Sequence, residues 1–143
     1  MSDPAGEAIA AFQRWSDGFN ARDVEAQVAT MHFPHVRISA TNELQRWESA
    51  DDFRAQHDRL TERLRAEGWD HTASPSIEVV QVGDQKVHLA MHQSRQHADG
   101  TEYNGFDTLW IFTQIDGRWG VQFRSSFLAN AAQGFRAGSE GKS

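Results

Sequence analysis

The chain has 143 residues and a formal net charge of −6, from 20 acidic and 14 basic side chains. This length fits one domain that buries its own core without covalent staples. The sequence has no cysteine, which excludes disulfides and thiolate metal sites. The arginines of residues 54–65 alternate with acidic residues, so this segment predicts a solvated helix face rather than a nucleic-acid surface.

Membrane and export signals are also missing from the sequence. No stretch approaches the roughly 20 apolar residues that a membrane-spanning helix needs. The first seven residues are small and acidic and lack the basic and apolar regions of a signal peptide. We therefore expect a cytoplasmic protein with neither a membrane nor a nucleic acid as its partner.

Three helices are predicted in the first half of the chain. Residues 4–20 carry an apolar stripe at helical spacing behind a proline suited to the first turn. A second helix is predicted over 23–31, ended by Pro34. A third is predicted between Ser49, a good N-cap, and Gly68, which ends it.

The remaining segments alternate between apolar and polar residues and contain enough β-branched residues to predict strands. Asp-Gly pairs at 99–100 and 116–117 predict tight hairpins between long strands. Helices on one face of an antiparallel sheet give an α+β layer pair, and a curled sheet leaves a concave mouth where ligands bind. The predicted strands span 35–40, 44–47, 76–82, 86–97, 103–115 and 118–127.

Two segments carry a family resemblance. AIAAFQRWSDGFNARDVEAQVATMHFP resembles the first two helices of the nuclear transport factor 2-like superfamily, and DTLWIFTQIDGRWGVQFRSSF is similar to its last hairpin. That superfamily includes ketosteroid isomerases, polyketide cyclases and scytalone dehydratases. The resemblance implies an α+β, cystatin-like cone, with three N-terminal helices packed on a curved, mixed, mainly antiparallel sheet. We expect a single domain of this kind over 1–129. From Asn130 onward the chain is small, polar and glycine-rich, which predicts a disordered tail over 130–143.

The resemblance also implies three positions used by the isomerases. They fall on Trp15 for a hydrogen-bond donor, near Ser39 for the base, and near Thr108, beside Asp107, for a second acid. Proton abstraction next to a carbonyl needs a base of tuned pKa, and a serine hydroxyl is not one. We therefore expect no steroid-type isomerisation.

Two other residues are candidates for proton transfer. His57 lies on the apolar stripe of the third predicted helix, which in the superfamily faces the interior of the cone. The alternative for His57 is a core histidine bonded to a backbone carbonyl. Asp107 is expected either to pair with His57, His92 or Arg124 inside the mouth or to point outward, because nothing in the sequence anchors the face of its strand.

The candidate pocket wall consists of aromatic and basic side chains. Arg124 is a candidate for binding a carboxylate if its strand face points inward, and a dimer contact if that face points outward. The predicted pocket-lining residues are Trp15, Trp47, His92, Tyr103, Trp110 and Arg124.

No cofactor or metal is expected. The sequence has neither a metal-binding H-E-x-x-H motif, nor a phosphate-binding glycine loop, nor a nucleophile elbow. Three hypotheses remain open: a cofactor-free lyase, isomerase or cyclase acting on a hydrophobic carbonyl compound, a module that binds a small apolar ligand, and a structural subunit. All three are compatible with a homodimer formed through the sheet face.

Overall fold

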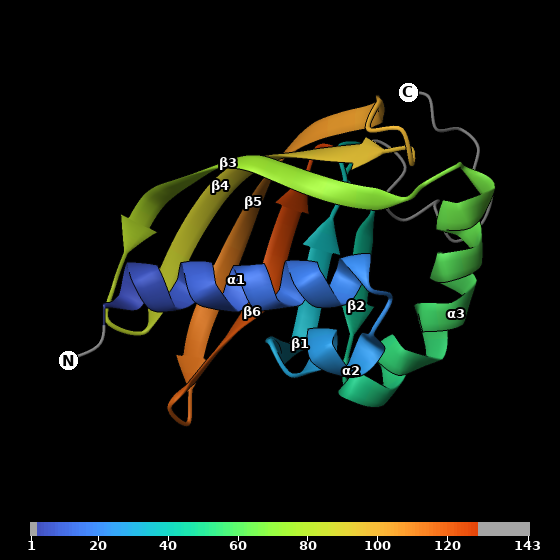
Figure 1. The fold of residues 1–143 in the computed structure, drawn as a ribbon. Helices are drawn as coiled ribbons and strands as arrows, with labels where there is room; N and C mark the ends of the chain where they lie inside the picture. Colours follow the sequence, from blue (N-terminus) through green and yellow to red (C-terminus); the bar gives the residue numbers. More distant parts are fainter. Residues whose placement is uncertain (1–2, 129–143) are drawn as a thin grey trace.

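The structure is a computed structural model that describes residues 3–128. Three helices and a six-stranded sheet form two layers, with α1 lying across the concave face of the sheet (Figure 1). The α+β cone expected from the sequence is confirmed. The elements are α1 Pro4–Asn20, α2 Val24–Val28, β1 Met31–Ile38, β2 Leu44–Trp47, α3 Ala50–Ala66, β3 His71–Val82, β4 Lys86–Gln96, β5 Glu102–Ile115 and β6 Arg118–Ser126.

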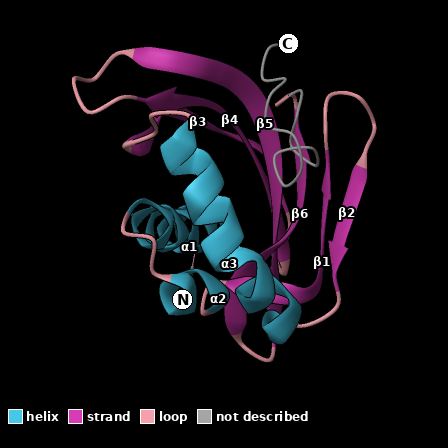
Figure 2. Cartoon of the chain, turned by 90° about the vertical axis from the view of Figure 1, so that its right-hand side faces the viewer, coloured by secondary structure: helices cyan, strands magenta, loops and turns pink. Residues whose placement is uncertain are grey.

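The sheet is mixed, with the strand order β2-β1-β6-β5-β4-β3. The four strands β3 to β6 form an antiparallel meander, and β1 adds to it in parallel alongside β6. The sheet curves around the helices, which all lie on one side of it (Figure 2). This curvature makes the hollow that the sequence predicted.

The core lies between α1 and the concave face of the sheet. Phe12 and Trp15 from α1 meet Trp110 of β5 edge to face, with ring centroids 5.0 and 4.9 Å apart. Edge-to-face contacts of this kind stabilise by about 0.5–1.5 kcal/mol beyond the apolar area they bury. They fix α1 against the middle of the sheet.

Local capping explains where α3 begins and ends. The side chain of Ser49 accepts a hydrogen bond from the Asp52 amide, and acidic residues fill the first turn. Gly68 then takes a φ of +84°, a conformation that glycine adopts without steric cost. Both helix limits agree with the sequence prediction.

Two boundaries differ from the predictions. The second helix ends at Val28, and Met31 already belongs to a strand that contains Pro34. The amide of Val121 donates to the carbonyl of Thr30, so pairing with β6 begins before the proline that was expected to end a helix. Strand β3 likewise begins at His71 rather than residue 76, because its pairing with β4 continues across an irregularity at Pro75.

A bulge in β6 has the largest consequence for the site. Val121 pairs with Phe112 and Phe123 pairs with Ile111, so Gln122 is an extra residue in the ladder. Simple alternation placed Arg124 on the face opposite to Val121. The extra residue shifts that alternation by one and brings both side chains to the concave face, where both are buried.

Within residues 3–128, no helix is long and apolar enough to span a membrane. The predicted tail at 130–143 lies outside the described residues.

Candidate anion-binding site

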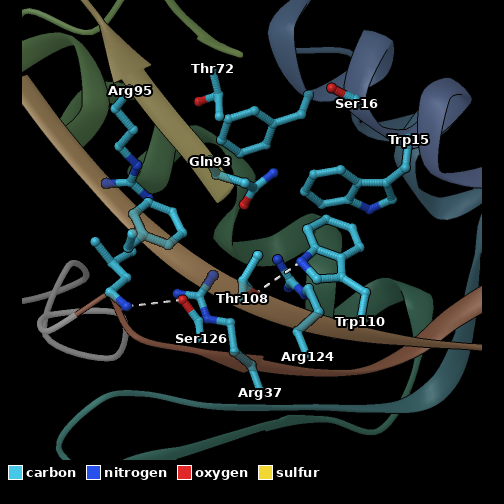
Figure 3. A pocket seen from close by; sticks show the side chains of 13 residues that line it. Trp15, Ser16, Arg37, Thr72, Gln93, Arg95, Thr108, Trp110, Arg124 and Ser126 are labelled. Carbon is cyan, nitrogen blue, oxygen red and sulfur yellow. Dashed lines mark hydrogen bonds between the residues drawn. The ribbon is translucent and has the colours of Figure 1, made fainter. Parts of the chain in front are cut away.

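A pocket lies between α1 and the concave face of the sheet, where every strand except β2 contributes side chains (Figure 3). Its empty volume is about 470 Å³, part of which opens to solvent at the mouth. The lining residues are Trp15, Ser16, Phe19, Arg37, Thr72, Gln93, Arg95, Phe106, Thr108, Trp110, Arg124, Ser126 and Leu128.

The charge of the pocket is one-sided. Three arginines line it, Arg37 from β1, Arg95 from β4 and Arg124 from β6. None of the described lining residues is an aspartate, a glutamate or a histidine. Guanidinium groups are only hydrogen-bond donors and stay charged under ordinary conditions. This lining therefore favours ligands that carry acceptor oxygens and a negative charge.

Arg124 is the most enclosed of the three, with 6% of its surface exposed. Its Nε donates to Nε2 of His35 at 3.0 Å, and its guanidinium carbon lies 5.2, 5.4 and 5.9 Å from the ring centroids of three tryptophans. Among the described residues, no carboxylate pairs with it. Burial, followed by the charge of Arg37, holds the pKa of Arg124 well below its usual range. A buried cation without a counter-charge is costly.

Arg37 stands beside Arg124 in the parallel ladder, where the two residues are direct partners. Neighbouring strands are about 4.8 Å apart, so both side chains leave the sheet side by side on the concave face. Burial lowers the pKa of Arg37 to about 9, with a further contribution from the charge of Arg95. The two arginines form a cationic pair at one end of the pocket.

Arg95 lines the other end of the pocket and has a partner. Its Nη1 lies 3.5 Å from Oε1 of Glu67, at the C-terminal end of α3. The hydroxyl of Tyr103 donates to the same carboxylate oxygen at 2.7 Å. Arg95 therefore has a carboxylate counter-charge within reach, which Arg124 lacks among the described residues.

The rest of the wall is aromatic and hydroxylated. Trp15 and Phe19 stack from α1, with centroids 5.2 Å apart, and Phe106 faces them from β5. The indole Nε1 of Trp110 donates to Thr108, whose own hydroxyl donates to the Ser125 carbonyl. Figure 3 shows Trp15, Thr108 and Trp110 around the hollow, with the arginines along its sheet side. The wall is suited to a flat apolar body that carries a negative group.

His57 lies outside this pocket. Its Nε2 donates to the backbone carbonyl of Arg22 at 3.1 Å, which is the hydrogen bond of the alternative stated above, and its side chain is half-buried. Burial, followed by the charge of Arg22, lowers the pKa of His57. Its hydrogen bond joins α3 to the connection after α1.

Asp107 points away from the pocket. It lies opposite His92 in the β4–β5 ladder, and the two side chains pair at 3.0 Å on the outer face of the sheet. Their side chains are 80% and 40% exposed, respectively. The inward neighbour is Thr108, which is buried. The proton-transfer pair of His57 and Asp107 is therefore not brought together, because the pleat puts Asp107 and the helices on opposite sides of the sheet.

Three of the six expected wall residues line the pocket: Trp15, Trp110 and Arg124. Trp47 is in the core behind Arg124, where its Nε1 donates to Gln56. The hydroxyl of Tyr103 is hydrogen-bonded to Glu67, and His92 lies on the outer face of the sheet.

Sequence reasoning missed Arg37 and Arg95, although one available pattern pointed to the first of them. Arg37 follows His35 at a strand spacing of two, so whichever face holds one holds the other. Two strongly polar residues on the same face of a buried strand are uncommon and indicate a site.

Comparison with family models matches residues 6–123 to a family described as NTF2-like protein (DUF6841). The chain belongs to this NTF2-like family. Comparison with curated proteins gives no match. The family assignment confirms the superfamily resemblance and carries no particular reaction with it.

Solved structures share the fold of this NTF2-like protein at low sequence identity. An NTF2-like protein of unknown function from Shewanella oneidensis MR-1 is 12% identical, with a TM-score of 0.69 over 87% of this chain and 99% of the other. An NTF2-like protein with a cystatin-like fold from Novosphingobium aromaticivorans is 17% identical, with a TM-score of 0.70 over 94% and 87%. A ketosteroid isomerase-like protein from Erwinia carotovora atroseptica is 16% identical, with a TM-score of 0.65 over 89% and 97%. At these identities the likeness concerns the fold alone.

Proposed function

We propose that this NTF2-like protein binds a small organic anion with an apolar, ring-sized body inside its cone. The observation that carries the proposal is the buried guanidinium of Arg124, which has one neutral hydrogen-bond partner and no carboxylate among the described residues. A negative group beside it supplies the missing counter-charge. Charge-assisted hydrogen bonds of this kind are about twice as strong as neutral ones.

The neighbouring arginine strengthens the case for an anion. Arg37 and Arg124 are ladder partners, and the charge of each contributes to the positive potential at one end of the pocket. A bound anion relieves the repulsion between them and is held by both. The stacked rings of Trp15 and Phe19 then supply an apolar wall for the ligand body.

Binding is favoured over proton transfer by the chemistry of the lining. The charged lining groups among the described residues are arginines, whose guanidinium groups donate hydrogen bonds and do not accept a proton. A general base with a pKa near the working pH is what proton abstraction requires. His57 is bonded to the backbone and Asp107 lies on the other face, so neither supplies one.

The test compares two ligands of nearly identical shape. Benzoate and its neutral analogue benzamide are titrated separately into the protein in a calorimeter at neutral pH and low salt. We expect benzoate to bind and benzamide to bind at least about tenfold more weakly, since only the first carries a charge for the guanidinium pair. Equal affinity for both, or binding of benzamide alone, contradicts an anion site.

A further inference from the structure

His35 is a fully buried polar residue directly behind the pocket. It lies on β1, two residues before Arg37, with 0% of its surface exposed. Both of its ring nitrogens are engaged: Nδ1 lies 3.1 Å from the Val121 carbonyl, and Nε2 lies 3.0 Å from Nε of Arg124. It therefore bridges the backbone of β6 and the guanidinium that β6 sends into the cone.

These two contacts determine the tautomer of the ring. A guanidinium nitrogen is only a donor, so Nε2 of His35 must accept and carries no hydrogen. A carbonyl oxygen is only an acceptor, so Nδ1 must carry the hydrogen and donate it to Val121. The ring is neutral in this state. Burial, and next the charge of Arg124, hold its pKa well below the usual range.

The bridge also decides which edge of Arg124 is available to a ligand. A guanidinium has a side edge that uses Nε and an end edge formed by the two terminal nitrogens. His35 occupies Nε, so a bidentate ligand is left with the end edge. The guanidinium carbon also lies 5.2 to 5.9 Å from the ring centroids of Trp15, Trp47 and Trp110, so indole rings crowd the surroundings of this group.

We propose that His35 is a positioning residue that fixes Arg124 to present its end edge to the cone, and that the site therefore selects planar carboxylates over tetrahedral oxoanions. Two coplanar oxygens match the end edge with parallel hydrogen bonds. A sulfonate carries a third oxygen outside that plane, for which the end edge offers no parallel hydrogen bond. The inference rests on the proposed function and specifies the ligand class for the same pocket.

Aromatic packing keeps the imidazole in place. Its ring lies 5.7 Å from Trp47 and 6.4 Å from Phe33, measured between centroids, at tilted angles. Replacing His35 by phenylalanine preserves an aromatic ring of similar size but removes the acceptor. Replacing it by glutamine retains an acceptor for Arg124 and a donor for the Val121 carbonyl on one side chain.

The experiment measures the affinities of benzoate and benzenesulfonate for the wild-type protein, His35→Phe and His35→Gln. In the wild type we expect benzoate to bind about tenfold more tightly than benzenesulfonate. His35→Phe is expected to lower benzoate affinity about tenfold and to bring the ratio of the two affinities near one, because Arg124 is no longer fixed. His35→Gln is expected to restore both values to within about threefold.

The outcomes separate the two proposals. If the wild type binds both anions and His35→Phe keeps the same ratio, the positioning role is wrong while the anion site stands. If the wild type binds neither anion, both proposals are wrong. A nitrogen NMR spectrum of the wild-type imidazole is independent of folding in the variants: the hydrogen on Nδ1 is expected, and a hydrogen on Nε2 overturns the inference.

Discussion

The two faces of the sheet formed by β4 to β6 differ in how their charged side chains are paired and buried. On the outer face, His92 and Asp107 pair across the ladder and remain exposed to solvent. On the concave face, Arg124 is buried under three indoles without a carboxylate partner among the described residues. Exposed pairs contribute about 0–1 kcal/mol, whereas an uncompensated buried charge costs several. This uncompensated cost on the concave face is the basis for the anion site proposed there.

The largest expected effect is on stability. Shortening a side chain of β5 is expected to cost more on the concave face than on the outer face. Phe112 is fully buried on the concave face, while Ile111 beside it points outward and is half-buried. Phe112→Ala is expected to lower the free energy of unfolding by about 3–5 kcal/mol, because it leaves a cavity against α1. Ile111→Ala serves as the control with a smaller loss. Urea denaturation monitored by tryptophan fluorescence measures both, and equal losses contradict the assignment of faces.

The next effect is on binding. Arg124→Met removes the buried charge and is expected to weaken benzoate binding by about 100-fold, since hydrogen bonds to charged groups contribute about 1.5–3 kcal/mol each. Arg59→Met is the matched control, because Arg59 is exposed on α3 away from the pocket. Calorimetry with each purified variant measures the change. A variant lacking Arg124 that binds benzoate as tightly as the control excludes this residue as the anchor.

Binding is also expected to depend on pH. The pKa of Arg37 is lowered to about 9, and the protonated side chain is the form that attracts an anion. Benzoate affinity is therefore expected to be constant between pH 6 and 8 and to fall above pH 9, by up to about tenfold per pH unit. Bound anion favours the protonated form, so the pKa of Arg37 is expected to be higher in the complex than in the free protein. Affinity that rises through pH 9 contradicts a role for Arg37 in binding.

The smallest effect is expected on the outer face. Asp107→Asn removes the charge that pairs with His92, and both side chains are exposed. We expect a change in unfolding free energy below about 0.5 kcal/mol and no change in benzoate affinity. Thermal unfolding and calorimetry measure these two quantities. Loss of binding in this variant would return Asp107 to the candidate site. The homodimer expected through this face stays a prediction that sedimentation tests.

Much of the fold follows from local patterns in the sequence. The apolar stripe of residues 4–20, the Ser49 cap and the Asp-Gly hairpins depend on interactions between near neighbours, and each is found where expected. The start of β1 at Met31 could not be predicted in this way. It depends on pairing with β6, which lies about 90 residues further along the chain.

The site was less predictable for the same reason. The inward direction of Arg124 depends on an extra residue in β6, which is visible only once the pairing with β5 is known. The pairing of Arg37 with Arg124 depends on a parallel contact between distant strands. The role expected for His57 was inferred from helix periodicity. Periodicity indicates which face of α3 the residue lies on, but not that its ring is hydrogen-bonded to the Arg22 carbonyl.

The most direct test of the anion site is a crystal structure of the protein with benzoate bound. The account predicts the benzoate carboxylate within hydrogen-bond distance of the terminal nitrogens of Arg124, with its ring against Trp15 and Phe19. A benzoate found only on the outer face of the sheet, or in the cone with its carboxylate turned away from Arg37 and Arg124, would contradict it.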